Sequence, residues 1–460
     1  FAQKTVFVST ISSMSLSFTQ SACAKTVFSL SKPCLANSSI GAFFMSILIK
    51  NVLLNGARTD ILVDNGRFEK IGKLQGARAD EIFDGEDKAV LPAFYNMHTH
   101  CAMNLLKGYG DDKDLFDWLS GDIWPAEDKL TARDIYVGTK AGIAEMIRSG
   151  TVGFNDMYFE QPSIMQAAAE AGVRAKVAFV EVDNFDAKQR DMKIKGTADF
   201  LALPVPAPER VQKQIGVHAV YTSSEEMMDL ARKTARENAM NLHIHACETK
   251  KEVDDCFEKY GCSPIELFAK HGLLGENTVL AHAVWVNDKD IELIVETKTV
   301  LCANPSSNLK LCSGIMPFDK LQKAGCRLTL GTDGASSNNA LNMLFEMKML
   351  ALASKIQSGD PKAANAQDVF DVASKNGARA FGVDAGEIAE GKTADCVLVD
   401  LTNPFLTPRY NLISNMVYSA DTSCVDSVIC AGAFVMKNRV IDWERDILNE
   451  ARDIANRLKK

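Results

Sequence analysis

Two histidines stand one residue apart at the end of an apolar run, in the segment LPAFYNMHTH that covers residues 91–100. In an extended segment, residues i and i+2 point to the same side, so His98 and His100 present both imidazoles in one direction. Neutral imidazole is the commonest metal ligand in proteins. The pair therefore indicates a metal site, with two satisfied core histidines at a strand end as the alternative.

Three further segments end apolar runs on residues that could complete such a site. In NLHIHACE, His245 shares a face with His243, which we expect to be structural, and Glu248 follows three residues later. The segment TVLAH ends on His282, and RLTLGTD ends on Asp333. A histidine followed by a carboxylate lets one group hold a metal while the other moves protons. Taken singly, these residues are also typical of a helix start, a strand core and a turn.

The elements that must position these residues alternate between short apolar runs and helical patterns. One helix is marked over residues 131–150, with Thr131 and Asp134 as a capping pair and Gly150 as its stop. Eight candidate strands lie at about 88–98 and at 151–156, 173–183, 214–220, 241–245, 278–282, 299–304 and 327–333. This alternation predicts an α/β fold of the (β/α)8 TIM-barrel type, whose chemistry collects at the carboxyl ends of the strands.

The two flanks of this centre are rich in β patterns. Strands from Met45 onward are separated by the turn signals Asn55-Gly56 and Asn65-Gly66, and similar strands return near the end of the chain. We therefore expect a small β-sandwich domain formed from residues 45–94 and 384–445, a barrel over 95–383 and a final helix over 446–460. Residues 1–44 contain no Asp, Glu or Arg and stay unassigned, as a leader or an upstream segment.

Composition narrows the classes of partner. The net charge is −8 with no basic stripe, which argues against nucleic acid and for a small-molecule substrate. The longest apolar stretch is shorter than the roughly 18 residues of a membrane span, so no membrane association is expected. The 12 cysteines are irregularly spaced without a CxxC pair, which favours reduced thiols and a cytoplasmic protein. A homo-oligomer stays open.

Five motifs carry a resemblance to a known family. The segments PAFYNMHTH, HACE, LAHAV, NPSSNLKL and GTDGASSNN, in this order, resemble the amidohydrolase superfamily, and within it the branch of methylthioadenosine/S-adenosylhomocysteine deaminases and chlorotriazine hydrolases. The resemblance covers residues 45–445. It implies one divalent metal, zinc with iron as the alternative, held by His98, His100, His245 and Asp333. Members with two metals bridge them through a carboxylated lysine on the fourth strand, where this chain offers His218.

The resemblance also implies catalytic roles. A water activated at the metal attacks the amino-bearing carbon of a purine-like ring, while Asp333 and His282 orient the water and help to deprotonate it. Glu248 passes the proton to the ring nitrogen, and ammonia leaves. Because Glu248 must accept and then donate a proton, we expect a dry pocket to raise its pKa.

Substrate recognition is implied by weaker matches. In the family, the residue at the position of Trp118 packs on the substrate, and the one at Glu127 binds the ribose hydroxyls. The histidine at the position of His218 faces the substrate. Arg190 matches a second substrate arginine. A core tryptophan and a solvated glutamate are the plainer interpretations of Trp118 and Glu127. Where relatives that act on S-adenosylhomocysteine carry an arginine on the third strand, this chain has Phe179 or a neighbour. A methylthio tail or a plain nucleoside therefore stays open, and a charged tail is in question.

The resulting hypothesis is a metal-dependent aminohydrolase that releases ammonia from an adenosine-type nucleoside such as 5'-methylthioadenosine, S-adenosylhomocysteine or adenosine. The first alternative is an aminohydrolase or chlorohydrolase of another heterocycle, such as guanine, a pterin, cytosine or a triazine. The second is a non-catalytic binding protein on the same fold.

Overall fold

The computed structural model describes residues 45–113 and 115–459. The expected leader over residues 1–44 lies outside the described residues. Among those that are described, no helix has the length and apolar content that crossing a bilayer requires.

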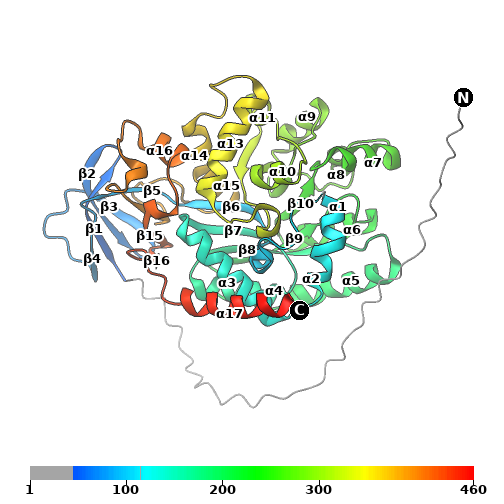
Figure 1. The fold of residues 1–460 in the computed structure, drawn as a ribbon, viewed down its shortest axis with the longest axis horizontal. Helices are drawn as coiled ribbons and strands as arrows, with labels where there is room; N and C mark the ends of the chain where they lie inside the picture. The colour runs from blue at the N-terminus through cyan, green and yellow to red at the C-terminus, as the bar shows by residue number, and fades with distance from the viewer. Residues whose placement is uncertain (1–44, 114, 460) are drawn as a thin grey trace, which may run out of the picture. The chain divides into compact units, whose positions relative to one another are not determined.

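Eight parallel strands form the central sheet, in the spatial order β13-β12-β11-β10-β9-β8-β7-β6. Figure 1 labels β6 to β10 of this sheet. At the remaining seam, the backbone N–H of Asp333 donates to the carbonyl of His98 at 3.0 Å, and that of Thr332 donates to Asn96 Oδ1 at 3.0 Å. The sheet therefore returns on itself as the predicted (β/α)8 barrel. Its strands are β6 (Phe94–Thr99), β7 (Thr151–Met157), β8 (Arg174–Glu181), β9 (Val211–Val217), β10 (Leu242–Ala246), β11 (Thr278–His282), β12 (Val300–Ala303) and β13 (Arg327–Leu330).

The single strand predicted over about 88–98 is wrong, because this segment forms two strands in two different sheets. β5 (Lys88–Pro92) pairs antiparallel with β14 (Cys396–Asp400) in the second sheet, whereas β6 pairs with β7 in the barrel. Ala93 is the junction, where its N–H donates to the carbonyl of Asp395 and that of Phe94 donates to the carbonyl of Gly150. The chain thus passes from one sheet to the other just before the histidine pair.

Helices surround the barrel strands in Figure 1. The predicted cap of α3 is confirmed: Thr131 and Asp134 form a reciprocal capping box, and the helix ends just before Gly150, which has φ +90°. The helices around the barrel are α3 (Ala132–Arg148), α4 (Gln161–Ala171), α5 (Ala187–Ala202), α6 (Glu225–Glu237), α7 (Lys250–Tyr260), α8 (Pro264–Lys270), α9 (Asp288–Thr297), α11 (Phe318–Lys323), α13 (Met343–Ser358), α14 (Ala366–Ala373) and α15 (Lys375–Phe381).

Short elements occupy the connections that follow β6, β12 and β13, at the carboxyl ends of these strands. They are η1 (Cys101–Leu106), α1 (Leu115–Trp118), η2 (Leu119–Ile123), α2 (Trp124–Glu127), α10 (Pro305–Lys310) and α12 (Ala335–Asn338). After β14 come η3 (Pro404–Leu406), α16 (Leu412–Tyr418), η4 (Thr422–Cys424) and, at the end of the described chain, α17 (Glu444–Leu458).

The second sheet takes strands from both flanks of the barrel, as predicted. Its members are β1 (Ile47–Leu54), β2 (Ala57–Asp64), β3 (Arg67–Gly72), β4 (Glu81–Asp84), β5, β14, β15 (Val425–Cys430) and β16 (Ala433–Met436). The turns at Asn55-Gly56 and Asn65-Gly66 have positive φ at both residues, which matches the twist of a tight hairpin. Gly432, between β15 and β16, lies so close to Gly66 that a Cβ at Gly432 would be 2.6 Å from the Gly66 Cα. The two ends of the sheet therefore meet around its own apolar core.

A buried ion pair ties the barrel to the segment that enters β14. Arg174, at the start of β8, donates from Nε to Asp395 Oδ2 at 2.7 Å and from Nη2 to Oδ1 at 3.1 Å. Tyr95 donates its hydroxyl to the same carboxylate, whose side chain is fully buried. The network therefore links the two sheets, and loss of one partner would leave a buried charge without compensation.

Candidate active site

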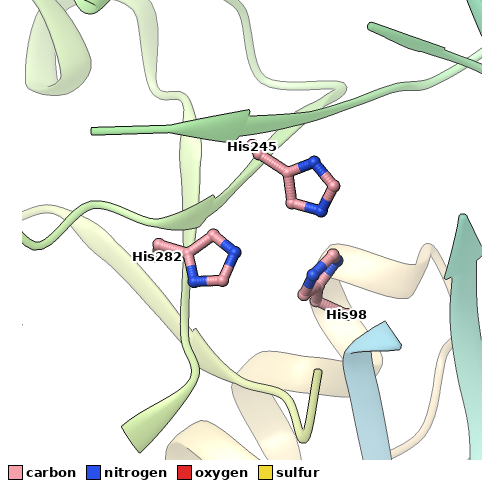
Figure 2. Close-up of side chains that lie close together, drawn as sticks. All are labelled: His98, His245 and His282. Carbon is pink, nitrogen blue, oxygen red and sulfur yellow. The ribbon is translucent and has the colours of Figure 1, made fainter. Parts of the chain in front are cut away.

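Five side chains converge at the carboxyl end of the barrel. The Nε2 atoms of His98 and His100 lie 3.2 and 3.3 Å from Asp333 Oδ1, and His245 Nε2 lies 3.3 Å from His100 Nε2. His98, His245 and His282 each offer a ring nitrogen within 4.8 Å of the others, and Figure 2 shows their rings facing a common centre. His98, His100 and Asp333 form a second group with the same spacing, so the four predicted ligands are divided between two groups that share His98.

The strands explain this convergence. His98 lies in β6, and His245 and His282 lie at or near the ends of β10 and β11, so parallel strands bring them to one end of the barrel. Two of the five have backbones in the left-handed region, His282 at φ +77° and Asp333 at φ +60°. Such conformations cost about 1–3 kcal/mol in a non-glycine residue and persist only where the surroundings fix them.

The ring nitrogens that face away from the centre are held by hydrogen bonds. His100 Nδ1 lies 2.5 Å from the carbonyl of Met157, and His245 Nδ1 lies 2.8 Å from the carbonyl of His218. A carbonyl only accepts, so both Nδ1 atoms carry a proton, and in the neutral ring Nε2 keeps the lone pair. This is the tautomer that a metal requires at Nε2.

His98 also has a partner at Nδ1, but this partner is another imidazole. Its Nδ1 lies 2.9 Å from His243 Nε2, while its own Nε2 is buried and has no hydrogen-bond partner among the described residues. A buried nitrogen left without a partner is costly unless another species fills the position. Together with the oriented His100, His245 and Asp333, this atom fits a divalent cation bound by three imidazoles and one carboxylate.

Burial and mutual contact shift the ionisation of this cluster. Burial lowers the pKa of His98 to about 4 and holds that of His245 well below its ordinary value. Burial also opposes charge on His100, but the hydrogen bond and charge of Asp333 outweigh it and raise its pKa to about 9. Burial disfavours the Asp333 carboxylate too, yet contact with His100 and His98 keeps its pKa well below the usual range. The surroundings of Asp333 therefore favour its ionised carboxylate next to a positive charge.

Glu248 lies beside the cluster, in the turn between β10 and α7. Its Oε1 accepts a hydrogen bond from Ser313 Oγ at 3.0 Å, and its Oε2 lies 3.8 Å from His282 Nε2. Glu252 holds the backbone of this turn by accepting from the N–H groups of Cys247 and Glu248 at 3.1 and 2.8 Å. Burial raises the pKa of Glu248, as expected for a group that must take up and release a proton near neutral pH.

Two of the predicted substrate residues face the same region. Glu127, at the end of α2, accepts from the Tyr158 hydroxyl at 2.5 Å, and the Tyr158 ring centre lies 6.4 Å from that of His100. Burial raises the pKa of Glu127 to about 7. His218 follows β9, with its ring 5.0 Å from that of His245 and its Nδ1 2.8 Å from Thr222 Oγ1. The roles of Glu127 and His218 in binding stay predictions.

The other two substrate candidates have strong local partners. Trp118 is buried and belongs to the apolar core of the barrel. Arg190, in α5, donates from Nε to Asp183 Oδ2 at 2.8 Å, and its Nη1 lies 3.6 Å from Glu226. The guanidinium is thus paired with Asp183 and lies near Glu226, and the roles of Trp118 and Arg190 in binding stay predictions.

Sequence reasoning did not assign roles to several residues that contact the cluster. His243 was expected to be structural, yet it is the Nδ1 partner of His98. Ser307 donates to Asp333 Oδ2 at 2.6 Å, Asn308 lies against His282, and Ser313 contacts Glu248. The NPSSN motif was the available signal, but a run of Pro, Ser and Asn also marks an ordinary turn.

Comparisons with known proteins agree with this geometry. The Amidohydrolase family model matches residues 89–435. A 5'-deoxyadenosine deaminase of Methanosphaera stadtmanae is 40% identical over 420 residues, which cover 90% of this chain and 99% of that protein. A 5-methylthioadenosine/S-adenosylhomocysteine deaminase of Thermococcus sibiricus is 41% identical over 399 residues, which cover 85% of this chain and 94% of that protein.

Solved structures show the same architecture. An adenosine deaminase of Xanthomonas campestris with bound zinc has a TM-score of 0.83 and 30% identity, over 90% of this chain and 98% of that one. An atrazine chlorohydrolase of Arthrobacter aurescens with zinc has a TM-score of 0.80 at 20% identity, over 89% of this chain and 100% of that one, a likeness of fold alone. The match over residues 89–435 and the two relatives near 40% identity show that the chain belongs to the amidohydrolase family.

Proposed function

We propose that this protein is a metal-dependent hydrolytic deaminase of adenosine-type nucleosides. The observation that carries the proposal is Glu248, a buried carboxyl with raised pKa whose Oε2 faces the histidine cluster. A structural metal site needs no such group, whereas hydrolysis of an amino group needs one that accepts and then donates a proton. The names of the two relatives near 40% identity support an adenosine-type ring.

The residues that would hold the metal are His98, His100 and His245 through Nε2, and Asp333 through Oδ1. We propose zinc, which commonly binds three protein ligands in catalytic sites and keeps one position open, with iron as the alternative. When bound, such a cation lowers the pKa of a water towards 7.

The protein's own groups then divide the proton transfers. Glu248 Oε2 takes one proton of the attacking water and delivers it to the ring nitrogen beside the amino-bearing carbon. The second proton of the water passes to the amino group, the bond between carbon and that nitrogen breaks, and ammonia leaves as the ring carbon becomes a carbonyl. Burial of Glu248 excludes water from the shuttle and brings its pKa closer to neutrality.

Recognition of the sugar favours a substrate with a neutral 5' group. We propose that Glu127 accepts from the ribose hydroxyls, that His218 faces the substrate and that Trp118 supports the wall of the pocket. Arg190 is neutralised by Asp183 and Glu226, so it offers no free charge for the carboxylate of a homocysteine tail. A 5'-deoxy, methylthio or hydroxyl group needs no such partner.

The test is ammonia release by metal-replete protein from 5'-deoxyadenosine, methylthioadenosine, adenosine and S-adenosylhomocysteine. We expect turnover of the first three and a lower kcat/KM for the fourth. Turnover of guanine, cytosine or a triazine with none of the nucleosides would refute the proposed substrate class. Purified protein with no stoichiometric metal and no turnover of any heterocycle would refute catalysis.

We also propose that the protein works in a reducing compartment such as the cytoplasm. Ten cysteines have described thiols, among them the buried Cys101, Cys247 and Cys302, and all ten are free. Free buried thiols are typical of proteins that do not rely on disulfides. Thiol counting under denaturing, non-reducing conditions on protein from the native cells would test this.

A further inference from the structure

His282 differs from the other histidines of the centre in the atom that faces its Nδ1. The Nδ1 atoms of His100 and His245 face backbone carbonyls, which only accept hydrogen bonds. His282 Nδ1 instead lies 2.9 Å from the side-chain Nδ2 of Asn308, in α10. An amide nitrogen only donates, so His282 Nδ1 is the acceptor and the ring proton is on Nε2.

A second amide near His282, that of Asn304, bonds to the backbone and leaves Nδ1 to Asn308. Asn304 satisfies its neighbours best with its amide oxygen and nitrogen exchanged, when the oxygen accepts from the backbone N–H of His282 at 3.2 Å and the nitrogen donates to the carbonyl of Ala303 at 3.1 Å. Asn308 is then the side-chain donor to His282 Nδ1. Since Asn308 is 2% exposed, water does not readily compete for this bond.

We propose that Asn308 is a positioning residue that holds His282 as the Nε2–H tautomer. His282 then has no lone pair at Nε2, so it is not a metal ligand, although its ring nitrogens lie close enough to those of His98 and His245 for an ion. Nor does it take a proton from the water. It donates a hydrogen bond from Nε2 to the oxygen that adds to the substrate carbon, a role that deepens the proposed deaminase function and rests on it.

Two neighbouring contacts support this division of roles. Within the same ten-residue stretch, Ser307 Oγ donates to Asp333 Oδ2 and Ser313 Oγ donates to Glu248 Oε1. Each bond occupies one atom of a reactive group and leaves the other facing the centre, Oδ1 of Asp333 and Oε2 of Glu248. Because Glu248 Oε2 is 3.8 Å from His282 Nε2, a donor at Nε2 suits a carboxylate that receives the proton.

The direct test is the tautomer of His282, measured by NMR on zinc-loaded and metal-free protein labelled with 15N-histidine. Protonated and unprotonated ring nitrogens resonate at clearly separate shifts, and the spectrum of His282→Gln identifies the His282 signals. We expect an unprotonated Nδ1 and a protonated Nε2 in His282 of both samples, and the reverse in His100 and His245 of the zinc-loaded protein. A protonated Nδ1 in His282 would overturn the proposal. The spectrum needs no substrate, so it tests the tautomer of His282 even if the protein deaminates no nucleoside.

A variant tests the consequence for catalysis. Asn308→Asp keeps the size of the side chain but replaces the donor by an acceptor, so the proton of His282 should move to Nδ1. We expect kcat to fall by about 10²- to 10⁴-fold, the scale of losing an oxyanion donor or setting a wrong tautomer, with little change in KM. Ser306→Ala, two positions earlier on α10, is the control and should keep the parent kcat. An Asn308→Asp protein with the parent kcat would overturn the functional role.

Discussion

Glu248→Gln separates proton transfer from metal binding. Glutamine keeps the shape of the side chain, and its amide oxygen can still accept from Ser313. It cannot take up a proton, so the path from the attacking water to the ring nitrogen is lost. None of the four proposed metal ligands is altered, so the metal content should stay at that of the parent.

The size of the effect follows from the position of Glu248. A positioned general acid and base contributes about 10²- to 10⁴-fold to rate, which corresponds to about 3–5 kcal/mol in activation free energy. Because Glu248 is buried, bulk water replaces the shuttle poorly, and we expect a loss of kcat near the upper end. The acid limb of the kcat/KM profile should lie above the ordinary range of a glutamate in the parent, because burial raises the pKa of Glu248, and should disappear in the variant.

The assay is ammonia release with 5'-deoxyadenosine, together with metal analysis of the same preparations. Glu258→Gln is the matched control, since Glu258 is exposed on α7, and it should keep the parent rate. A Glu248→Gln protein that deaminates at the parent rate would refute the shuttle. A variant that loses its metal would show instead that Glu248 helps to hold the ion.

Three further outcomes are expected. Glu127→Gln should raise KM about 10- to 100-fold, the scale of a hydrogen bond to a charged group. The KM of the parent protein should also rise as pH falls through about 7, where Glu127 becomes protonated. A parent KM that is constant across this pH region would contradict the role of Glu127 in binding. Asp395→Ala should lower the free energy of unfolding by about 3–5 kcal/mol, because it leaves Arg174 buried without its partner, and urea denaturation measures this. Chelation should abolish turnover while leaving the circular dichroism spectrum unchanged, since the barrel core does not depend on an ion, and added zinc should restore activity.

Much of the fold follows from local patterns. The asparagine-glycine pairs at 55–56 and 65–66 mark hairpins because both residues tolerate positive φ, and Thr131 marks the start of α3 through its cap. The change of sheet at Ala93 is marked only by Pro92, a residue that often ends a strand, and apolar residues on both sides of it make the two strands resemble one. β5 belongs to the second sheet, where Leu91 pairs with Val397, a contact that only the tertiary fold creates.

Candidate ligands are also predictable, because strand alternation places His98 and His100 on one side and the motifs supply the remaining positions. The contacts that each side chain makes are not. Arg190 matches a substrate arginine, and its ion pair with Asp183 across the turn after β8 has no mark in the sequence although the two residues are close along the chain. His243 shares a face with His245 in the sequence, yet its contact with His98 depends on strands that are 145 residues apart.

No sequence motif predicts which ring nitrogen of each histidine carries the proton. His245 and His282 stand at the carboxyl ends of neighbouring strands, but His282 pairs in register with Ala246, so alternation alone would turn it to the other face. Its ring reaches the centre from a backbone with φ +77°. Their chemistry differs because the carbonyl of His218 faces one Nδ1 and the amide of Asn308 faces the other. A carbonyl leaves the lone pair on Nε2 and makes a ligand, whereas an amide donor leaves the proton there and makes a hydrogen-bond donor. Because α10 follows β12, neither the strand that carries His282 nor its immediate sequence determines which of these two roles the imidazole takes.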